Sequence, residues 1–313
     1  MLFRRRHGMS AAAGEALAHV LSSPTFELIP LKDAMDHAPF LPPGARVSVT
    51  SSPIKGIEST VALSEQLQAA GFLAVPHLSA RMVRDSSHLG DLLARLQIAG
   101  VRQAFIVGGD AKVSGDFPDG LSLLRGMEEI GHPLADIGIP CYPQGHPFIA
   151  DHALLEALRE KAAYASYMTT QLCFDPGAIA AWLAARRSEG ISVPVHLGVP
   201  GVTDPQRLLA ISARIGVADT HRFLTKNIRF VARLVRSGGF FRPDGLLEGL
   251  APHIADQVAG IAGLHLYTFN AVKPTEVWRR RYLAGLNAAH QARSTPFAVE
   301  DAGGRARSPG ERP

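Results

Sequence analysis

The sequence has little cysteine, with only Cys141 and Cys173 among its 313 residues. So small a number excludes the disulfide-stabilised scaffolds found among small secreted domains. Neither cysteine has a second cysteine or a histidine beside it at ligand spacing, which argues against a metal centre built on this pair. Both cysteines fall at the ends of apolar runs, so we expect two buried thiols, a reducing cytoplasmic environment and no bound metal.

Long apolar runs are also missing, and none reaches the length that spans a membrane. The N-terminus begins with a basic segment, but Glu15 and His19 interrupt what would be the apolar core of a signal peptide. We therefore predict that residues 1–23 form a flexible leader followed by a short helix. A mitochondrial transit peptide is the alternative, because the leader is rich in arginine.

Charged residues are sparse as well, at 19% of the chain with a net charge of +4. Part of the basic excess lies in two arginine clusters, at residues 4–6 and 279–281, and not in a stripe or module that binds nucleic acid. We expect neither a nucleic-acid partner nor a membrane partner. A mildly basic surface of this kind would attract an anionic small ligand.

Several well-known catalytic motifs are absent. The sequence contains no His-Glu-x-x-His, no Gly-x-Ser-x-Gly and no Walker loop, and Gly108-Gly109-Asp110 is not a dinucleotide-binding fingerprint. Their absence argues against zinc proteases, α/β-hydrolases and P-loop nucleotidases. The function therefore has to be sought in the order of the structural elements and in the residues at their ends.

What the sequence does contain is a regular alternation of short apolar runs with longer amphipathic segments. The runs typical of strands are Thr25–Pro30, Arg46–Thr50, Phe72–His77, Gln103–Val107, Asp136–Cys141, Tyr167–Phe174, Val193–Val199 and Leu264–Phe269. The segments with helical spacing are Ile57–Ala70, Ser86–Ala99, Asp119–Ile130, Asp151–Ala162, Pro176–Glu189 and Asp204–Ile215. Strands that alternate with helices predict a parallel sheet, and eight of them fit a closed (β/α)₈ barrel, here over residues 24–291. The long stretch Val217–Gly263 predicts extra helices between strands seven and eight, and residues 292–313 a disordered tail.

In such barrels the chemistry lies at the C-terminal ends of the strands. Glu27 lies within the first apolar run, where a carboxyl is costly unless it is protonated, paired or functional; a structural ion pair is the competing interpretation. After the fourth run, Gly108 and Gly109 allow the backbone to approach a ligand closely, and Asp110 follows them. Other polar residues at strand ends are His77, Tyr142, His146, Gln171 and Tyr267.

Taken in order, these strand ends resemble those of the methylenetetrahydrofolate reductases. The matching segments are Phe26-Glu27 with Pro30, Val47-Ser48-Val49-Thr50, Pro76-His77-Leu78, Gly109-Asp110, Tyr142-Pro143 with His146-Pro147, Thr170-Gln171 with Phe174-Asp175, Pro200-Gly201-Val202, and His265 with Tyr267-Thr268 and Asn270. That family is a barrel that binds FAD and passes hydride from NAD(P)H to 5,10-methylenetetrahydrofolate, giving 5-methyltetrahydrofolate. The resemblance thus implies a folate substrate, FAD as cofactor and NAD(P)H as co-substrate.

The resemblance also implies a role for each matching residue. Glu27 matches the general acid that protonates the bridging nitrogen of the folate, and burial of a carboxyl favours the protonated form that this role needs. Asp110 matches an aspartate near the flavin and the pterin, where it tunes the charge at the reacting centre. Gln171 matches the glutamine that hydrogen-bonds the folate, and Tyr267 is assigned to the substrate side as well. The positions implied to bind the cofactor are Thr50, His77, Gly109, Asp110, Tyr142, His146 and Lys161.

Three positions depart from the family pattern, all on the flavin side. Gly108 replaces the usual arginine before Gly-Asp, Thr50-Ser51-Ser52-Pro53 replaces a Thr-Tyr-Gly, and Asp151 is the nearest counterpart of an aspartate on the fifth helix. Four alternatives therefore stay open. The enzyme could work without flavin, could oxidise 5-methyltetrahydrofolate, or could be an FAD-linked barrel acting on another substrate, as proline dehydrogenase does. A non-catalytic pterin-binding barrel or subunit is the fourth, and association into a homo-oligomer is also open.

Overall fold

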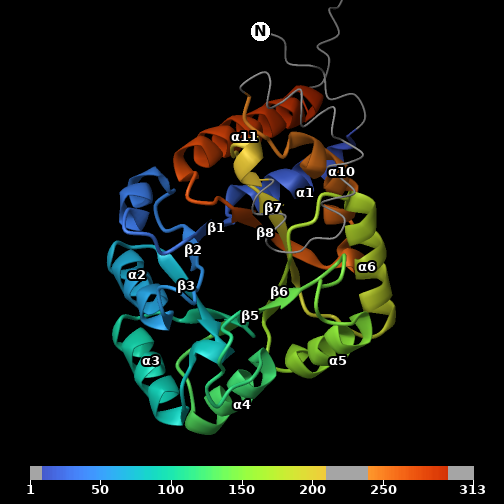
Figure 1. The fold of residues 1–313 in the computed structure, drawn as a ribbon. Helices are drawn as coiled ribbons and strands as arrows, with labels where there is room; N and C mark the ends of the chain where they lie inside the picture. Colours follow the sequence, from blue (N-terminus) through green and yellow to red (C-terminus); the bar gives the residue numbers. More distant parts are fainter. Residues whose placement is uncertain (1–8, 209–238, 295–313) are drawn as a thin grey trace, which may run out of the picture.

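The computed structural model describes residues 9–208 and 239–294. Within these residues the strands form one closed barrel, β1 to β8 in sequence order, and the last strand pairs in parallel with the first (Figure 1). The strands are β1 Thr25–Leu28, β2 Arg46–Val49, β3 Leu73–Ser79, β4 Gln103–Val107, β5 Asp136–Cys141, β6 Tyr167–Thr170, β7 Val195–Pro200 and β8 Ile261–Tyr267. The predicted (β/α)₈ fold is confirmed.

Helices surround this barrel in Figure 1. The α-helices that the structure describes are α1 Ala11–Ser22, α2 Ile57–Ala69, α3 Ser86–Ile98, α4 Gly120–Ile130, α5 Asp151–Ala162, α6 Pro176–Ser188, α10 Asp244–Ile254 and α11 Val272–Ser294, with 3-10 turns at η1 Ala34–Phe40, η2 Ala80–Met82 and η3 Gln257–Ala259. Polar caps start several of them. The Asp119 carboxylate accepts from Ser122 N at the start of α4, and the Asp175 carboxylate accepts from Gly177 N at the start of α6. The apolar core lies between the strands and these helices.

Four strands end earlier than predicted: β1 at Leu28, β2 at Val49, β6 at Thr170 and β8 at Tyr267. The early ends of β6 and β8 shape the site. β6 ends at Thr170 and not at Phe174, because the Gln171 side chain accepts from Leu172 N and the chain then turns toward the cap of α6. β8 ends at Tyr267 and not at Phe269. Phe269 and Asn270 have φ values of 51° and 60°, a left-handed conformation that cannot continue a strand.

Some predicted segments fall wholly or partly outside the described residues. The helix expected over Asp204–Ile215 is described only to Leu208, where residues 205–208 are helical. Of the extra helices expected between β7 and β8, the structure describes α10 and η3, and residues 209–238 lie outside it. α11 runs to Ser294 and so includes the first three residues of the tail predicted over 292–313, and residues 295–313 are outside as well.

The lumen of the barrel is more polar than usual for this fold, where branched apolar side chains dominate. A series of rings runs from β3 to β7: His77 lies 4.8 Å from Phe105, Phe105 lies 6.3 Å from Tyr167, and Tyr167 stacks on His196 at 4.4 Å between centroids. Burial lowers the pKa of His77 to about 4 and that of His196 to about 4. Both rings are therefore neutral at pH 7.

Because of these two histidines, we predict that the free energy of unfolding decreases in mild acid. Their pKa values in the folded protein, about 4, lie below the unfolded value of about 6.5. The unfolded chain therefore binds more protons in that window, so stability is intact above about pH 6.5 and declines as the pH falls toward 4. At about pH 5 each histidine should lower the free energy of unfolding by about 1 to 2 kcal/mol.

Urea unfolding followed by circular dichroism at pH 7 and pH 5 measures this loss. His196→Phe keeps a ring against Tyr167 and should remove its share of the pH dependence. His19→Gln, at an exposed position on α1, should leave the pH dependence unchanged. An equal pH dependence in wild type and His196→Phe would contradict the prediction.

Candidate functional site

One cavity of about 1290 Å³ opens at the C-terminal ends of the strands. Its walls come from the ends of β1 to β6 and β8 and from the loops that follow them. All of the residues predicted for the site line this cavity: Glu27, Thr50, His77, Gly109, Asp110, Tyr142, His146, Lys161, Gln171 and Tyr267. The structure thus brings them to one place, while their individual roles stay predictions.

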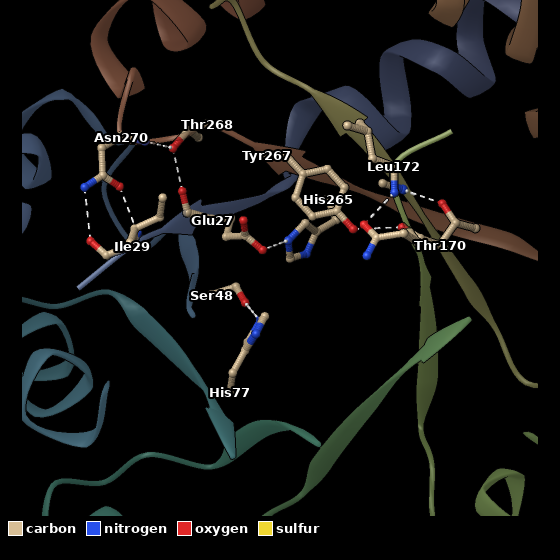
Figure 2. Close-up of polar contacts among 12 residues, drawn as sticks. Glu27, Ile29, Ser48, His77, Thr170, Leu172, His265, Tyr267, Thr268 and Asn270 are labelled. Atoms are coloured by element: carbon tan, nitrogen blue, oxygen red, sulfur yellow. Dashed lines mark hydrogen bonds and ion pairs between the residues drawn. The ribbon is translucent and has the colours of Figure 1, made fainter. Parts of the chain in front are cut away.

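Glu27 lies on β1 and is 8% exposed. Its Oε2 atom is 3.2 Å from Nε2 of His265 on β8, and Figure 2 shows the two side chains facing each other. The backbone oxygen of Glu27 accepts a hydrogen bond from the Thr268 hydroxyl. Glu27 is thereby held through its side chain by His265 on β8 and through its backbone by Thr268, the residue that follows β8.

Asn270 ties the loop after β8 to the loop after β1. Its side chain accepts from Ile29 N at 2.8 Å and donates to Ile29 O at 3.0 Å (Figure 2). Such a two-point amide contact fixes both backbone groups at the end of β1. It holds the strand end that carries Glu27 in a defined position relative to β8.

His77 and Ser48 form a second polar pair near Glu27. The Ser48 hydroxyl and Nε2 of His77 are 2.7 Å apart (Figure 2). Because burial keeps His77 neutral at pH 7, its ring offers one donor nitrogen and one acceptor nitrogen. His77 can thus hydrogen-bond Ser48 and a ligand at the same time without adding charge to the cavity.

The two residues predicted on the substrate side are already engaged with the backbone. The Tyr267 hydroxyl donates to Thr170 O at 2.8 Å, and burial raises the pKa of Tyr267 well above its ordinary value, so the phenol stays protonated. The side-chain oxygen of Gln171, Oε1, accepts a hydrogen bond from Leu172 N at 2.8 Å. The NH₂ group is therefore the part of Gln171 best placed to meet a ligand.

The loop after β4 carries Asp110 and is packed tightly against the loop after β3. Gly109 has φ +87°, and a Cβ atom there would overlap the Ser79 hydroxyl. The Arg81 guanidinium donates to the backbone carbonyls of Ala111 at 2.7 Å and Lys112 at 3.1 Å, and these two hydrogen bonds hold the loop after β4 in place. Asp110 itself is exposed on the cavity wall.

Tyr142, His146 and Lys161 form the far wall of the cavity. The Tyr142 and His146 rings meet edge to face at 5.3 Å. Burial raises the pKa of Tyr142 to about 12 and lowers that of His146, and the Asp110 carboxylate opposes the shift of His146. Burial also lowers the pKa of Lys161, while Asp119 raises it. Among the described residues no carboxylate lies within ion-pair distance of Lys161, so its charge is open to an anionic ligand.

A model of the family described as methylenetetrahydrofolate reductase matches residues 33–228, more than half of the chain. The chain belongs to this family. The match covers the segment from η1 into the stretch after β7, so it includes most of the cavity wall. The protein is accordingly an oxidoreductase of the methylenetetrahydrofolate reductase family.

Solved structures with similar backbones have little sequence in common with the chain. A Burkholderia cenocepacia protein described as a phosphonomutase is 12% identical, with a TM-score of 0.44 over 90% of this chain and 98% of its own. The Bacillus cereus spore cortex-lytic enzyme SleL is 9% identical, with a TM-score of 0.49 over 89% of this chain and 84% of its own. The family assignment rests on the family model and not on these structures.

The departures from the methylenetetrahydrofolate reductase pattern also lie on the cavity wall. Gly108 and Ser51 line it, where the family has arginine and tyrosine. Asp151 lines it too, and its Oδ1 atom would lie 3.0 Å from a Cβ placed on Gly145 in the loop after β5. Arg81 brings a guanidinium to the wall near Gly108, but its donors bind backbone carbonyls of the loop.

Sequence reasoning did not assign a role to His265, Arg81 or Ser79. His265 was named only within a matching segment, and its position two residues before Tyr267, on the same face of β8, could have suggested a role. Arg81 and Ser79 carry no comparable signal, because their partners are backbone atoms and a glycine in another loop. No helix among the described residues is long and apolar enough to cross a membrane.

Proposed function

We propose that the protein reduces 5,10-methylenetetrahydrofolate to 5-methyltetrahydrofolate with hydride that comes from NAD(P)H, using FAD as the intermediate carrier. The observation that carries this proposal is the placement of Glu27. A carboxyl that is almost fully buried lines a large cavity in an oxidoreductase of this family. Such a group is suited to deliver one proton to a substrate nitrogen.

The residues of the cavity fit a flavin dinucleotide. At about 1290 Å³ the cavity exceeds the volume of ordinary small-ligand pockets, roughly 300–1,000 Å³. Lys161, which has no ion-pair partner among residues 9–208 and 239–294, offers a cation for the diphosphate, while Thr50, His77, Tyr142 and His146 would line the remainder. Gly109, with its Cβ position already filled by Ser79, brings bare backbone to the wall. When bound, FAD would supply hydride to the folate.

The chain's own residues would supply the acid chemistry and the orientation of the substrate. Glu27 would donate its proton to the bridging nitrogen, so that the five-membered ring opens to an iminium that accepts hydride. Gln171 would hold the pterin edge through its NH₂ group, because its oxygen is occupied by Leu172 N. Asp110, on the cavity wall, would place a negative charge near the cation that forms.

The visible spectrum of the purified protein tests this proposal. A yellow protein that bleaches on anaerobic addition of 5-methyltetrahydrofolate would have both bound flavin and methyl-folate chemistry, as proposed. A yellow protein that does not bleach would contain bound flavin, as proposed, but would refute the proposal that 5-methyltetrahydrofolate reacts with it. Buffer without folate is the matched control, since light and traces of reductant also bleach flavins.

A second candidate is direct hydride transfer from NAD(P)H to the folate without flavin. The replacement of the family's arginine and tyrosine by Gly108 and Ser51 favours it, because both positions line the cavity on the flavin side. A colourless protein that oxidises NAD(P)H only when methylenetetrahydrofolate is present would support this candidate over the first.

Replacing Gln171 with alanine should impair folate use selectively. Loss of the amide should raise KM for methylenetetrahydrofolate about 10- to 100-fold, since one hydrogen bond to a ligand is worth about 1.5–3 kcal/mol when a charged or buried group is involved. Oxidation of NAD(P)H by an artificial acceptor should change less than threefold. An equal loss in both assays would contradict the assignment of Gln171 to the substrate.

A further inference from the structure

We propose that His265 is a positioning residue that holds Glu27 and returns a proton to it after each turnover. This inference rests on the proposed function, in which Glu27 gives its proton to the folate. His265 is 3% exposed, and its Nε2 atom lies 3.2 Å from Oε2 of Glu27. The pair joins the first and last strands of the barrel, as Figure 2 shows, and both residues line the cavity.

The reaction needs such a supply because each reduction with NAD(P)H consumes one proton. When Glu27 donates, its O–H bond breaks as an N–H bond forms on the folate, and a carboxylate remains. The Nε2–H bond of His265 then breaks as a new O–H bond forms on Oε2. In exchange the ring takes a proton from a hydronium ion or a buffer acid of the solvent, so the net proton comes from solvent.

The other groups that face His265 are unable to replace it. His77 on β3 and His196 on β7 both influence the field around it, but burial lowers both pKa values to about 4, so both rings are neutral at pH 7 and are poor acids toward Glu27. Tyr267, whose ring lies 4.9 Å away, donates its hydroxyl to Thr170 O, and its pKa is raised. Of the groups identified around Glu27, only His265 touches the carboxyl with a titratable nitrogen.

Two substitutions separate positioning from proton supply. His265→Phe removes both nitrogens while it keeps a ring against Tyr267. His265→Gln keeps an amide N–H donor near the position of Nε2, beside Glu27, but cannot relay a proton. His196→Phe is the matched control, because it removes a second lumen histidine that has no contact with Glu27 among the described residues. Each is assayed under single-turnover conditions, with enzyme in excess over methylenetetrahydrofolate, and in the steady state.

We expect His265→Phe to lower steady-state kcat about 100-fold, at the low end of the effect of a positioned acid–base group. His265→Gln should show a single-turnover rate within about threefold of wild type, because one turnover needs no second proton and the amide still holds Glu27, yet its steady-state rate should fall about 30- to 100-fold. The steady-state solvent deuterium effect should grow in the same variant. His196→Phe should match wild type in both assays.

Each contrary result has a distinct meaning. If wild type does not reduce methylenetetrahydrofolate at all, the proposed function fails and the role of His265 falls with it. If wild type is active and His265→Gln has a normal steady-state rate, the role of His265 alone is overturned. If His265→Gln is equally slow in both assays, or His196→Phe is slowed to the same degree, His265 supports the structure and does not supply the proton.

Discussion

Glu27→Gln should abolish methylenetetrahydrofolate reduction, lowering kcat about 10³-fold, within the range expected when a positioned general acid is removed. Glutamine has nearly the shape of glutamate and can still meet His265, but it has no proton to give to the bridging nitrogen. The Kd for the folate should change less than threefold, because Glu27 acts on the reacting nitrogen and not on the pterin edge. Turnover with NAD(P)H and a calorimetric titration measure the two quantities.

The control for this substitution is Glu276→Gln on α11. Glu276 is 3% exposed and binds the guanidinium groups of Arg279 and Arg280, each at 2.6 Å, and it is not among the cavity-lining residues. Breaking this buried ion pair should lower the unfolding temperature and leave kcat at 25 °C unchanged. Retention of more than about a tenth of wild-type kcat in Glu27→Gln would remove it from the acid role, since general acids contribute far more.

Gly109→Ala should lower kcat/KM at least about 100-fold, since displacement of a reacting or charged group by about 1 Å has an effect of that size. The new Cβ would overlap the Ser79 hydroxyl, and φ of +87° is unfavourable for alanine, so the loop that carries Asp110 must shift. The displaced loop also forms part of the wall proposed for the flavin. Turnover and ligand affinity should therefore fall together.

Two further variants show that the overlap causes the effect. Ser79→Ala removes a hydroxyl that has no hydrogen-bond partner among the described residues, so Gly109→Ala combined with Ser79→Ala should regain most of the activity. The nearest atom is then the Cβ at position 79, 3.2 Å away. Gly44→Ala, with φ +67° and no atom within 4 Å, changes the backbone preference alone and should leave activity intact. No recovery in the double variant would refute the steric explanation.

The barrel itself could be predicted because its parallel strands are buried on both faces and form short apolar runs separated by helical spacing. The residues at which the strands end could not be predicted in the same way. β6 ends at Thr170 because the Gln171 side chain bonds to the next backbone N–H, which is a local choice that apolar content does not reveal. β8 ends shortly before two non-glycine residues with left-handed φ values; Asn270 is of a type that tolerates this conformation, but Phe269 gives no such signal.

The sequence predicted which residues line the site better than it predicted which of them contact one another. Strand ends of a barrel converge, so residues placed there by sequence meet in one cavity. The partners within that cavity depend on register: Glu27 is level with Tyr267 in the pairing of β1 with β8, which brings His265 beneath it. Register between strands so far apart in the chain follows from closure of the whole barrel and cannot be derived from either strand alone.

The contact between Glu27 and His265 joins residues 238 positions apart, and the Ile29–Asn270 contact spans 241. Contacts of such sequence separation form late in folding, because a long loop must close before they are gained. The acid is therefore assembled only when β8 docks against β1. During refolding, enzymatic activity should appear after the helical signal has recovered, so that the catalytic acid reports on the last step in the formation of the fold.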